Sequence, residues 1–257
     1  MSIQLYPARA NDYYSEVAAG NIPGHSLVHK FGRNDGVPNG SFELVSMLST
    51  TPIFLTQSSA VTMRVAAGHA NDDTAGSHAT EITVNGLDST GAFVEQSVAT
   101  AGASASSNFA TDMLRVYRAW VSGVGTYGNA NNSAVAIEDS GGASNYINIA
   151  AGAGKSEHCA YTIPLNKTGY MLSVSLYVDA SKAANFVMYK RESITDTSAP
   201  MSSKRTQLYW DGVLQPVAYI PKSPMKFSGL TDVWIEAAGG GAGTEVSADM
   251  EILLVDD

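Results

Sequence analysis

The chain has little cysteine, and it has no long apolar run. Cys159 is the only cysteine among 257 residues, so no disulfide can form within the chain and stability must come from burial and backbone pairing. No apolar run approaches the roughly 20 residues that a membrane-spanning helix needs. Residues 1–10 lack the basic stretch and apolar run of a signal peptide. These absences predict a soluble protein that is made in a cytoplasm.

Charged side chains, and basic ones above all, are also scarce. Only 15% of the residues are charged, against roughly 25% in an average domain. The chain has 15 Lys and Arg residues and 24 Asp and Glu residues, which gives a formal net charge of -9. Because nucleic-acid binding requires basic residues that neutralise phosphates, a nucleic-acid partner is not expected. Small and polar residues fill the gap, and this mix suits short strands joined by many turns.

Alternation of apolar and polar residues predicts β-strands along most of the chain. Val61, Met63 and Val65 recur at every second position, which is typical of a half-buried strand. Residues 113–121 fit a short helix or a strand, and their β-branched and aromatic content favours the strand. Turn-forming residues, among them Asn85-Gly86, separate the strands. The other predicted strands are residues 81–84, 93–94, 134–137, 146–149, 157–163, 171–178, 186–189, 207–210, 213–219, 233–236 and 247–255.

Many short strands and almost no amphipathic helix predict an all-β fold, an antiparallel β-sandwich or jelly roll. Alanine and glycine crowd together at residues 150–155. The chain is therefore either one large β domain or two packed β modules, residues 41–155 and residues 156–257.

Residues 1–40 are interpreted as an extended N-terminal arm. Asn11 is placed to cap a short helix over residues 12–19, and Gly20 is placed to end it. Turn-forming residues follow, with little periodic hydrophobicity between them. A loop-rich edge of the same β domain is the alternative for this region.

Three features suggest a bound ion or nucleotide, and each has a plainer explanation. Residues 152–156 (GAGKS) resemble the end of a phosphate-binding P-loop, but Ile149 stands where the first glycine belongs and a strand is predicted to follow. The oxygen-rich residues 71–74, which include Asp72 and Asp73, suit calcium but are also ordinary turn residues. The five histidines lack zinc-site spacing. Neither a metal nor a cofactor is expected.

Catalytic and sugar-binding arrangements are weighed in the same way. His158 and Cys159 are neighbours in a predicted strand, so their side chains face opposite sides and cannot form a nucleophile–base pair. No GxSxG motif or recognisable carboxylate pair is present. Trp120, Trp210 and Trp234 suit either a platform for sugar rings or core and interface positions, and the second use is favoured. The chain is therefore expected not to be an enzyme.

Six stretches occur in a characteristic order and spacing. They are residues 20–26 (GNIPGHS), 30–34 (KFGRN), 84–88 (VNGLD), 114–119 (LRVYRA), 161–170 (YTIPLNKTGY) and 252–257 (ILLVDD). As an ordered set they resemble virion structural proteins of tailed, often marine, bacteriophages. The resemblance runs from near residue 20 to the C-terminus and implies no catalytic residues.

This resemblance implies a virion component that is assembled in the host cytoplasm and that binds other virion proteins, a major capsid or tail protein, and further copies of itself. We predict a capsid decoration or cement protein that stabilises the outer shell. The alternative is a tail-associated or knob protein that contributes to host-surface binding. Membrane association is not expected. The predicted assembly contacts of the arm are Ile22, Pro23, His25, Leu27, Lys30, Phe31, Arg33 and Asn34.

Overall fold

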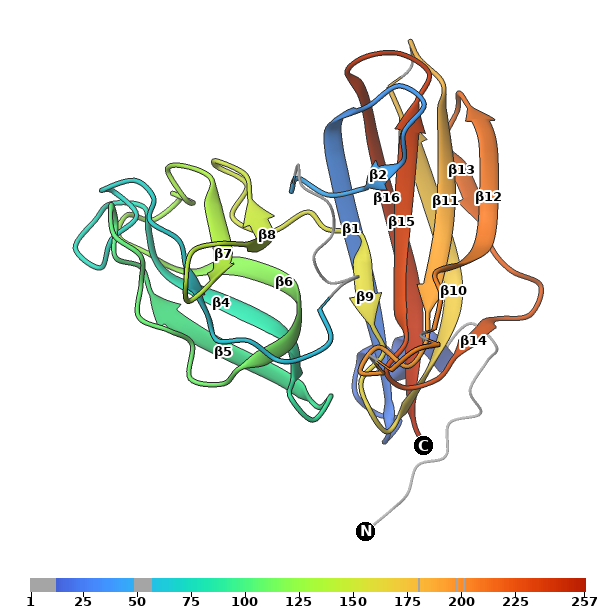
Figure 1. Ribbon diagram of the computed structural model, residues 1–257, viewed down its shortest axis with the longest axis horizontal. Helices are drawn as coiled ribbons and strands as arrows, with labels where there is room; N and C mark the ends of the chain where they lie inside the picture. The colour runs from blue at the N-terminus through green and yellow to red at the C-terminus, as the bar shows by residue number, and fades with distance from the viewer. Residues whose placement is uncertain (1–12, 49–56, 180, 197, 201) are drawn as a thin grey trace.

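The computed structural model describes residues 13–48, 57–179, 181–196, 198–200 and 202–257. These residues form two lobes, a β-sandwich and a smaller β module beside it (Figure 1). Every pairing between the named strands is antiparallel, so the predicted all-β class with antiparallel sheets is confirmed. In the described part of the chain, no helix is both long enough and apolar enough to cross a membrane.

The sandwich consists of two five-stranded sheets that face each other (Figure 1). The first sheet has the order β1-β16-β10-β13, with β14 also paired to β10. The second has the order β12-β11-β15-β2, with β9 also paired to β15. The strands of the first sheet are β1 (His25–Val37), β16 (Thr244–Asp256), β10 (Lys167–Val178), β13 (Val217–Tyr219) and β14 (Met225–Phe227). Those of the second are β12 (Arg205–Val213), β11 (Ala184–Arg191), β15 (Asp232–Gly239), β2 (Glu43–Leu44) and β9 (Ala160–Thr162).

Alternating side chains of both sheets fill the space between them. Val174 and Leu176 of β10 point inward from one sheet, and Phe186 and Met188 of β11 point inward from the other. All four are fully buried. Burying each such side chain stabilises the fold by about 1.5–3 kcal/mol, so this shared core holds the two sheets together.

The smaller module contains two three-stranded sheets with a core of their own. One sheet has the order β5-β4-β6 and the other β3-β7-β8. Ile82, Val84, Ile137 and Ile147 are among the fully buried residues between them. The strands are β3 (Met63–Val65), β4 (Ala79–Asp88), β5 (Phe93–Ala99), β6 (Met113–Val124), β7 (Val135–Asp139) and β8 (Asn145–Ile149).

The smaller module is inserted into a single strand position of the sandwich. Strand β2 pairs with β15 where Leu44 lies opposite Glu236, and β9 pairs with the same strand where Ala160 lies opposite Trp234. Between these two pairings the amide of Cys159 donates to the carbonyl of Val45 at 3.0 Å. The chain therefore leaves and re-enters the sandwich at adjacent points, and we call β3–β8 the inserted module.

The prediction of an extended arm over residues 1–40 is wrong for residues 25–37. These residues form β1, which pairs with β16 of the same chain from His25 opposite Val255 to Val37 opposite Thr244. Gly32 and Asn34 are residue types that are typical of turns, so the sequence pattern did not indicate this strand. A Cβ atom at Gly32 would overlap backbone atoms of Val45 and Cys159, and the Asn34 side chain accepts a hydrogen bond from the amide of Gly36 at 2.9 Å.

The short N-terminal helix is confirmed as α1 (Tyr13–Ala18), followed by Gly20 with a φ of 76°. The predicted cap Asn11 and the remainder of residues 1–12 lie outside the described residues. Residues 43–44 form β2 of the sandwich, whereas the predicted module of residues 41–155 included them.

Two local predictions within the inserted module have opposite outcomes. Residues 113–121 belong to β6, so the strand is confirmed and the helical alternative is wrong. Asn85-Gly86 lies inside β4 instead of forming a turn. A β-bulge brings the backbone oxygen of Arg115 so close to Gly86 that a Cβ atom there would overlap it.

Candidate functional site

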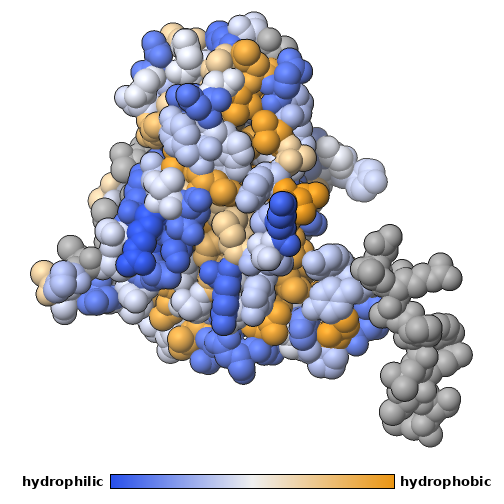
Figure 2. Space-filling view, turned by 90° about the vertical axis from the view of Figure 1, so that its right-hand side faces the viewer, coloured by the Kyte–Doolittle hydropathy of each residue, from blue (hydrophilic) through white to orange (hydrophobic). Residues whose placement is uncertain are grey.

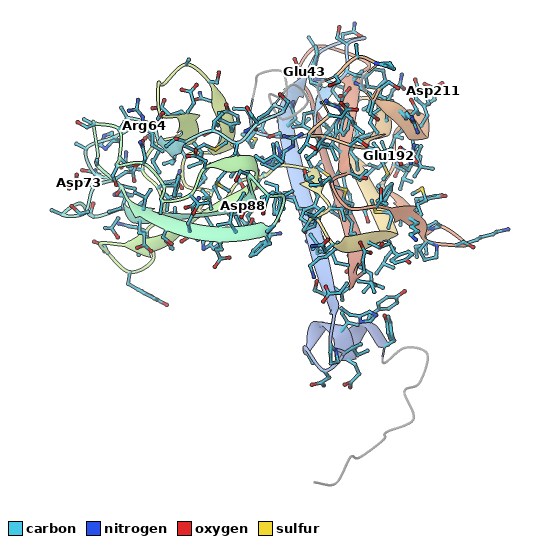
Figure 3. All side chains as sticks on the ribbon, turned by 60° about the horizontal axis from the view of Figure 1, so that its bottom comes forward. Glu43, Arg64, Asp73, Asp88, Glu192 and Asp211 are labelled. Atoms are coloured by element: carbon cyan, nitrogen blue, oxygen red, sulfur yellow. The ribbon has the colours of Figure 1, made fainter. Side chains whose placement is uncertain are left out.

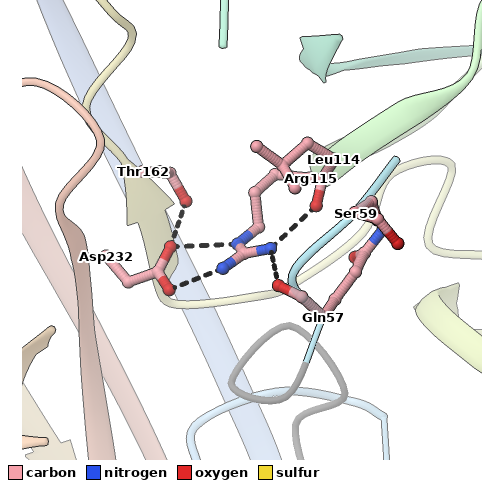
Figure 4. A network of polar contacts seen from close by, with 6 residues as sticks. All are labelled: Gln57, Ser59, Leu114, Arg115, Thr162 and Asp232. Atoms are coloured by element: carbon pink, nitrogen blue, oxygen red, sulfur yellow. Dashed lines mark hydrogen bonds and ion pairs between the residues drawn. The ribbon is translucent and has the colours of Figure 1, made fainter. Parts of the chain in front are cut away.

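A buried ion pair joins the inserted module to the sandwich (Figure 4). Arg115 of β6 donates from Nε and Nη2 to the two carboxylate oxygens of Asp232 of β15, at 3.0 Å and 2.9 Å. The Thr162 hydroxyl donates to the same carboxylate at 2.6 Å. Nη1 donates to the carbonyls of Gln57 and Leu114, each at 2.8 Å. Both charged side chains are buried from solvent. The hydrogen bonds within the protein therefore replace those that water would make to the two charges.

A second set of contacts lies further along the same junction. The ring of Tyr117 of β6 packs against the ring of Tyr161 of β9, with centroids 4.6 Å apart. The side-chain nitrogen of Lys30 of β1 donates to the backbone oxygen of Tyr117. Arg118 donates to the backbone oxygen of His29 at 2.6 Å. The two modules therefore meet through packing, hydrogen bonds and an ion pair together.

Burial shifts the pKa values of three groups near this junction. Burial, with Arg118 nearby, lowers the pKa of Lys30 to about 7. Burial, with Lys30 nearby, lowers the pKa of His158 to about 3, and the His158 ring is hydrogen-bonded to the Ser46 hydroxyl at 3.0 Å. Burial raises the pKa of the Cys159 thiol to about 12. The uncharged forms are favoured in all three, so Cys159 is not an activated nucleophile.

The shift at Lys30 predicts that stability rises with pH. An unfolded chain keeps Lys30 protonated up to a pKa near 10.5, whereas the folded chain releases the proton near pH 7. Its contribution is therefore complete above the unfolded pKa and is lost as the pH falls towards 7. We expect the free energy of unfolding in urea to increase by about 2 kcal/mol between pH 7 and pH 9, and the variant Lys30→Met to remove most of this increase.

The pH range of 7 to 9 and a control variant separate the effect of Lys30 from that of other titrating groups. His158 titrates below the window, and Cys159, Tyr117 and Tyr161 keep their protons throughout it because burial raises the pKa of each. The unfolded thiol ionises near pH 9 and opposes the rise above that pH. Lys226→Met removes an exposed lysine and should leave the slope unchanged. An equal slope in Lys30→Met and in the unchanged protein would contradict the assignment.

A cleft of about 720 Å³ opens beside this junction, between β1 and the β5-β4-β6 sheet. Strand β1 contributes three of the predicted assembly residues to it, Leu27, Lys30 and Phe31. The inserted module and the segment that leads back to β9 supply the opposite wall. The remaining lining residues are His29, Asn85, Glu95, Arg118, Trp120, Lys155 and Ser156.

The other predicted assembly residues are spread along and before β1. Ile22 and Pro23 precede the strand, and the ring of His25 is hydrogen-bonded to the carbonyl of Pro23 at 2.9 Å. Arg33 forms ion pairs with Asp35 and Glu157, each at 3.0 Å. The side chains of Lys30 and Asn34 are buried within the chain itself. An assembly role for the accessible residues stays a prediction.

The P-loop-like residues 152–156 form no phosphate-binding loop. The amide of Val121 donates to Gly154 O, and that of Ser156 donates to Ala119 O, each at 2.8 Å, so the segment runs alongside β6. Strand β9 follows it, and no helix begins there. The segment instead places Lys155 beside Trp120 on the wall of the cleft.

The oxygen-rich residues 71–74 lie at the outer end of the inserted module, where Figure 3 labels Asp73. The buried carboxylate of Asp72 accepts hydrogen bonds from the amides of Ala79, Asn132 and Ser133, at 2.8–3.2 Å. Asp73 accepts from the amide of Ala75 at 3.0 Å. Backbone amides therefore supply hydrogen bonds to both carboxylates without a metal ion. Among the described residues, no three His, Cys, Asp or Glu side chains are grouped to hold a metal ion.

The three tryptophans have different positions. Trp234 is fully buried and stacks on Tyr189, with centroids 5.5 Å apart, as a core residue does. Trp210 of β12 lies edge-on to Tyr219 of β13 at 6.0 Å. Trp120 is partly exposed and lines the cleft. Of the three, Trp120 lines a hollow of the size that a small ligand needs.

No family model and no curated protein sequence matches the chain. Among solved structures it aligns weakly with the VP2 protein of infectious bursal disease virus in derived T=1 particles. The identity is 8% and the TM-score 0.20, and the alignment covers 99% of this chain and 80% of that one. A second structure, of infectious bursal virus derived T=1 particles, is 9% identical with a TM-score of 0.16 over 95% and 79% of the two chains. Likeness at this level carries no argument about fold or function.

Proposed function

We propose that the chain is a structural protein of a virus particle and acts through contacts with other subunits rather than by catalysis. Its strand order supports this. If β2 with β9, and β13 with β14, each count as one interrupted strand, both sheets have four strands and their order is that of a jelly roll. Virus capsid and lectin domains use this fold. The sequence resemblance to virion proteins of tailed bacteriophages points the same way.

The observation that carries the proposal is a set of exposed apolar side chains on or next to strands at the free edges of the sandwich. Tyr209 of β12, Leu214 and Ile220 are 53%, 54% and 75% exposed, and we call these three residues the edge surface. Figure 2 shows hydrophobic residues running down this side of the molecule between hydrophilic ones. Single exposed apolar residues are ordinary, but exposed apolar side chains on or next to open edge strands offer another chain a place to pack.

Within this class the proposal is a decoration or cement protein of the outer capsid. The buried ion pair and the packed tyrosines join the two modules. A chain joined in this way that binds through its edge surface adds buried area across the seams between capsid subunits. The second candidate is a tail-associated protein that contacts the host surface, and the cleft beside Trp120 is the observation that favours it.

Electron microscopy of assembled particles tests the proposal. We expect copies of the chain in a regular lattice over the capsid shell. We expect Ile220→Lys to reduce the bound copies at least about tenfold, because a lysine buried without a partner costs several kcal/mol at an interface.

The matched control is Tyr127→Lys, which places the same charge on a fully exposed side chain of the inserted module. It should leave the copy number unchanged. A small cluster at the tail would replace decoration by the tail-associated function. Absence of the chain from particles would contradict both.

A further inference from the structure

We propose that the cleft between β1 and the β5-β4-β6 sheet is a binding site for an acidic sugar, a pyranose ring that carries a carboxylate. Its volume of about 720 Å³ is that of a small-ligand site. The inference is independent of where the chain sits in a particle, because it concerns a site within one chain.

The wall formed by the β5-β4-β6 sheet is polar, in contrast to the opposite face of the same sheet. Asn85 of β4 lies opposite Glu95 of β5 and opposite Arg118 of β6. Two residues earlier, Thr83 lies opposite Ser97 and Trp120. Side chains two apart in a strand share a face, so these two rows form one surface. The residues between them, such as Ile82 and Val84, point into the module's core.

Trp120 is the aromatic member of this polar surface. Its neighbours Ala119 and Val121 pack with the core, so Trp120 belongs to the face that the core does not use. A partly exposed indole on a polar face offers an apolar plane, and the apolar side of a sugar ring packs on such a plane. Asn85 and Glu95, which line the cleft, place hydrogen-bonding side chains on the same face for the hydroxyl groups of the sugar.

Charge is distributed unevenly across the cleft. Arg118 and Lys155 lie on the β6 side, and the exposed Glu95 lies on the β5 side. Among the described residues, neither Arg118 nor Lys155 forms an ion pair with an acidic side chain. A carboxylate on the β6 side gains both cations, while hydroxyl groups on the β5 side meet an acceptor.

Asn85 supplies an additional reason for a ligand that donates hydrogen bonds. Its amide oxygen is buried and has no partner among the described residues. An unpaired buried acceptor raises the free energy of the folded chain, and a ligand hydroxyl removes that cost once the amide turns towards the cleft. A simple carboxylate anion would satisfy Arg118 and Lys155 but would leave the Trp120 plane and the Asn85 amide oxygen without a partner, whereas an acidic sugar adds a ring face and hydroxyl donors.

Calorimetric titration of the purified chain with trigalacturonate tests the site, with maltotriose as the neutral sugar and hexaglutamate as the acidic peptide. We expect trigalacturonate to bind with a dissociation constant of about 1 mM or tighter. Maltotriose should bind at least about tenfold more weakly, because it lacks the charge that Arg118 and Lys155 attract.

Two pairs of variants locate the binding. Trp120→Leu should weaken trigalacturonate binding at least about tenfold, whereas Trp210→Leu, the same change on the sandwich, should not. Lys155→Gln should reduce the preference for trigalacturonate over maltotriose, whereas Lys222→Gln, at another exposed lysine, should leave it unchanged. Circular dichroism establishes that each variant is folded. Saturation transfer from the indole protons to the sugar protons gives a second measurement of this contact in the unchanged protein.

Each remaining result overturns the proposal. Absence of trigalacturonate binding, or equal affinity for maltotriose, contradicts an acidic sugar as the ligand. Binding that survives Trp120→Leu in a folded protein places the ligand elsewhere. Tighter binding of hexaglutamate than of trigalacturonate, with the same dependence on Lys155, makes the cleft a peptide site.

Discussion

Replacing Asp232 with asparagine is expected to lower the free energy of unfolding by about 3–5 kcal/mol. The substitution keeps the shape of the side chain but leaves the guanidinium of Arg115 buried without a counter-charge. The hydroxyl of Thr162, which donates to the carboxylate at 2.6 Å, would then face an amide. Urea unfolding monitored by tryptophan fluorescence measures the loss, since Trp234 lies two residues from the substitution.

Two further variants separate this effect from simple loss of an ion pair. Asp256→Asn removes an exposed partner of Lys167 and should change the free energy of unfolding by at most about 1 kcal/mol. The double variant Arg115→Met with Asp232→Leu removes both buried charges and should recover most of the lost stability. A loss below about 1 kcal/mol in Asp232→Asn would show that the buried pair does not hold the modules together.

The second large effect is expected for Gly32→Ala, a change of one methyl group. Strand β1 passes so close to Val45 and Cys159 that the added Cβ atom would overlap backbone atoms of both. Backbone cannot move aside as a flexible side chain does, so either β1 must shift or the segment that leads into β9 must. We expect a loss of about 3 kcal/mol or more, at the upper end for overpacking, measured by thermal and urea unfolding.

Gly36→Ala is the matched control in the same strand. A Cβ atom at Gly36 meets no other atom within 4 Å, and its backbone φ is not in the left-handed region. This variant should be unchanged or more stable by about 0.5 kcal/mol, because alanine restricts the unfolded chain. Equal stability of the two variants would contradict the close approach at Gly32.

The regular strands could be predicted from the sequence because their alternation is uninterrupted. Residues 171–178 fall within β10, and residues 247–255 fall within β16. Strand β1 was missed because Gly32 and Asn34-Asp35-Gly36 are typical of turns. The presence of Gly32 in a strand is explained by its close contacts with residues 45 and 159, which are distant in the sequence. Gly86 was likewise predicted to lie in a turn, whereas its place in β4 is explained by the close approach of the Arg115 backbone.

The junction could not have been predicted from the sequence. Arg115 and Asp232 are 117 residues apart, and no local pattern links them. Trp120 did leave a signal in the sequence. It alternates with the apolar residues Ala119 and Val121 and follows Arg118 by two positions, so a polar side chain would be expected at its place. Lys155 drew attention through a P-loop-like motif, whereas its place on the cleft depends on the pairing of that segment with β6.

The pairing of β1 with β16 has a consequence for the order in which the chain folds during synthesis. His25 lies opposite Val255, so the first strand of the sandwich waits for the last one to leave the ribosome. The inserted module has its own core within residues 61–149, and its contacts form much earlier. Contacts between distant residues form slowly, and unpaired strand edges are prone to aggregation. We therefore expect a nascent chain to hold a folded module in its middle while β1 is still unpaired.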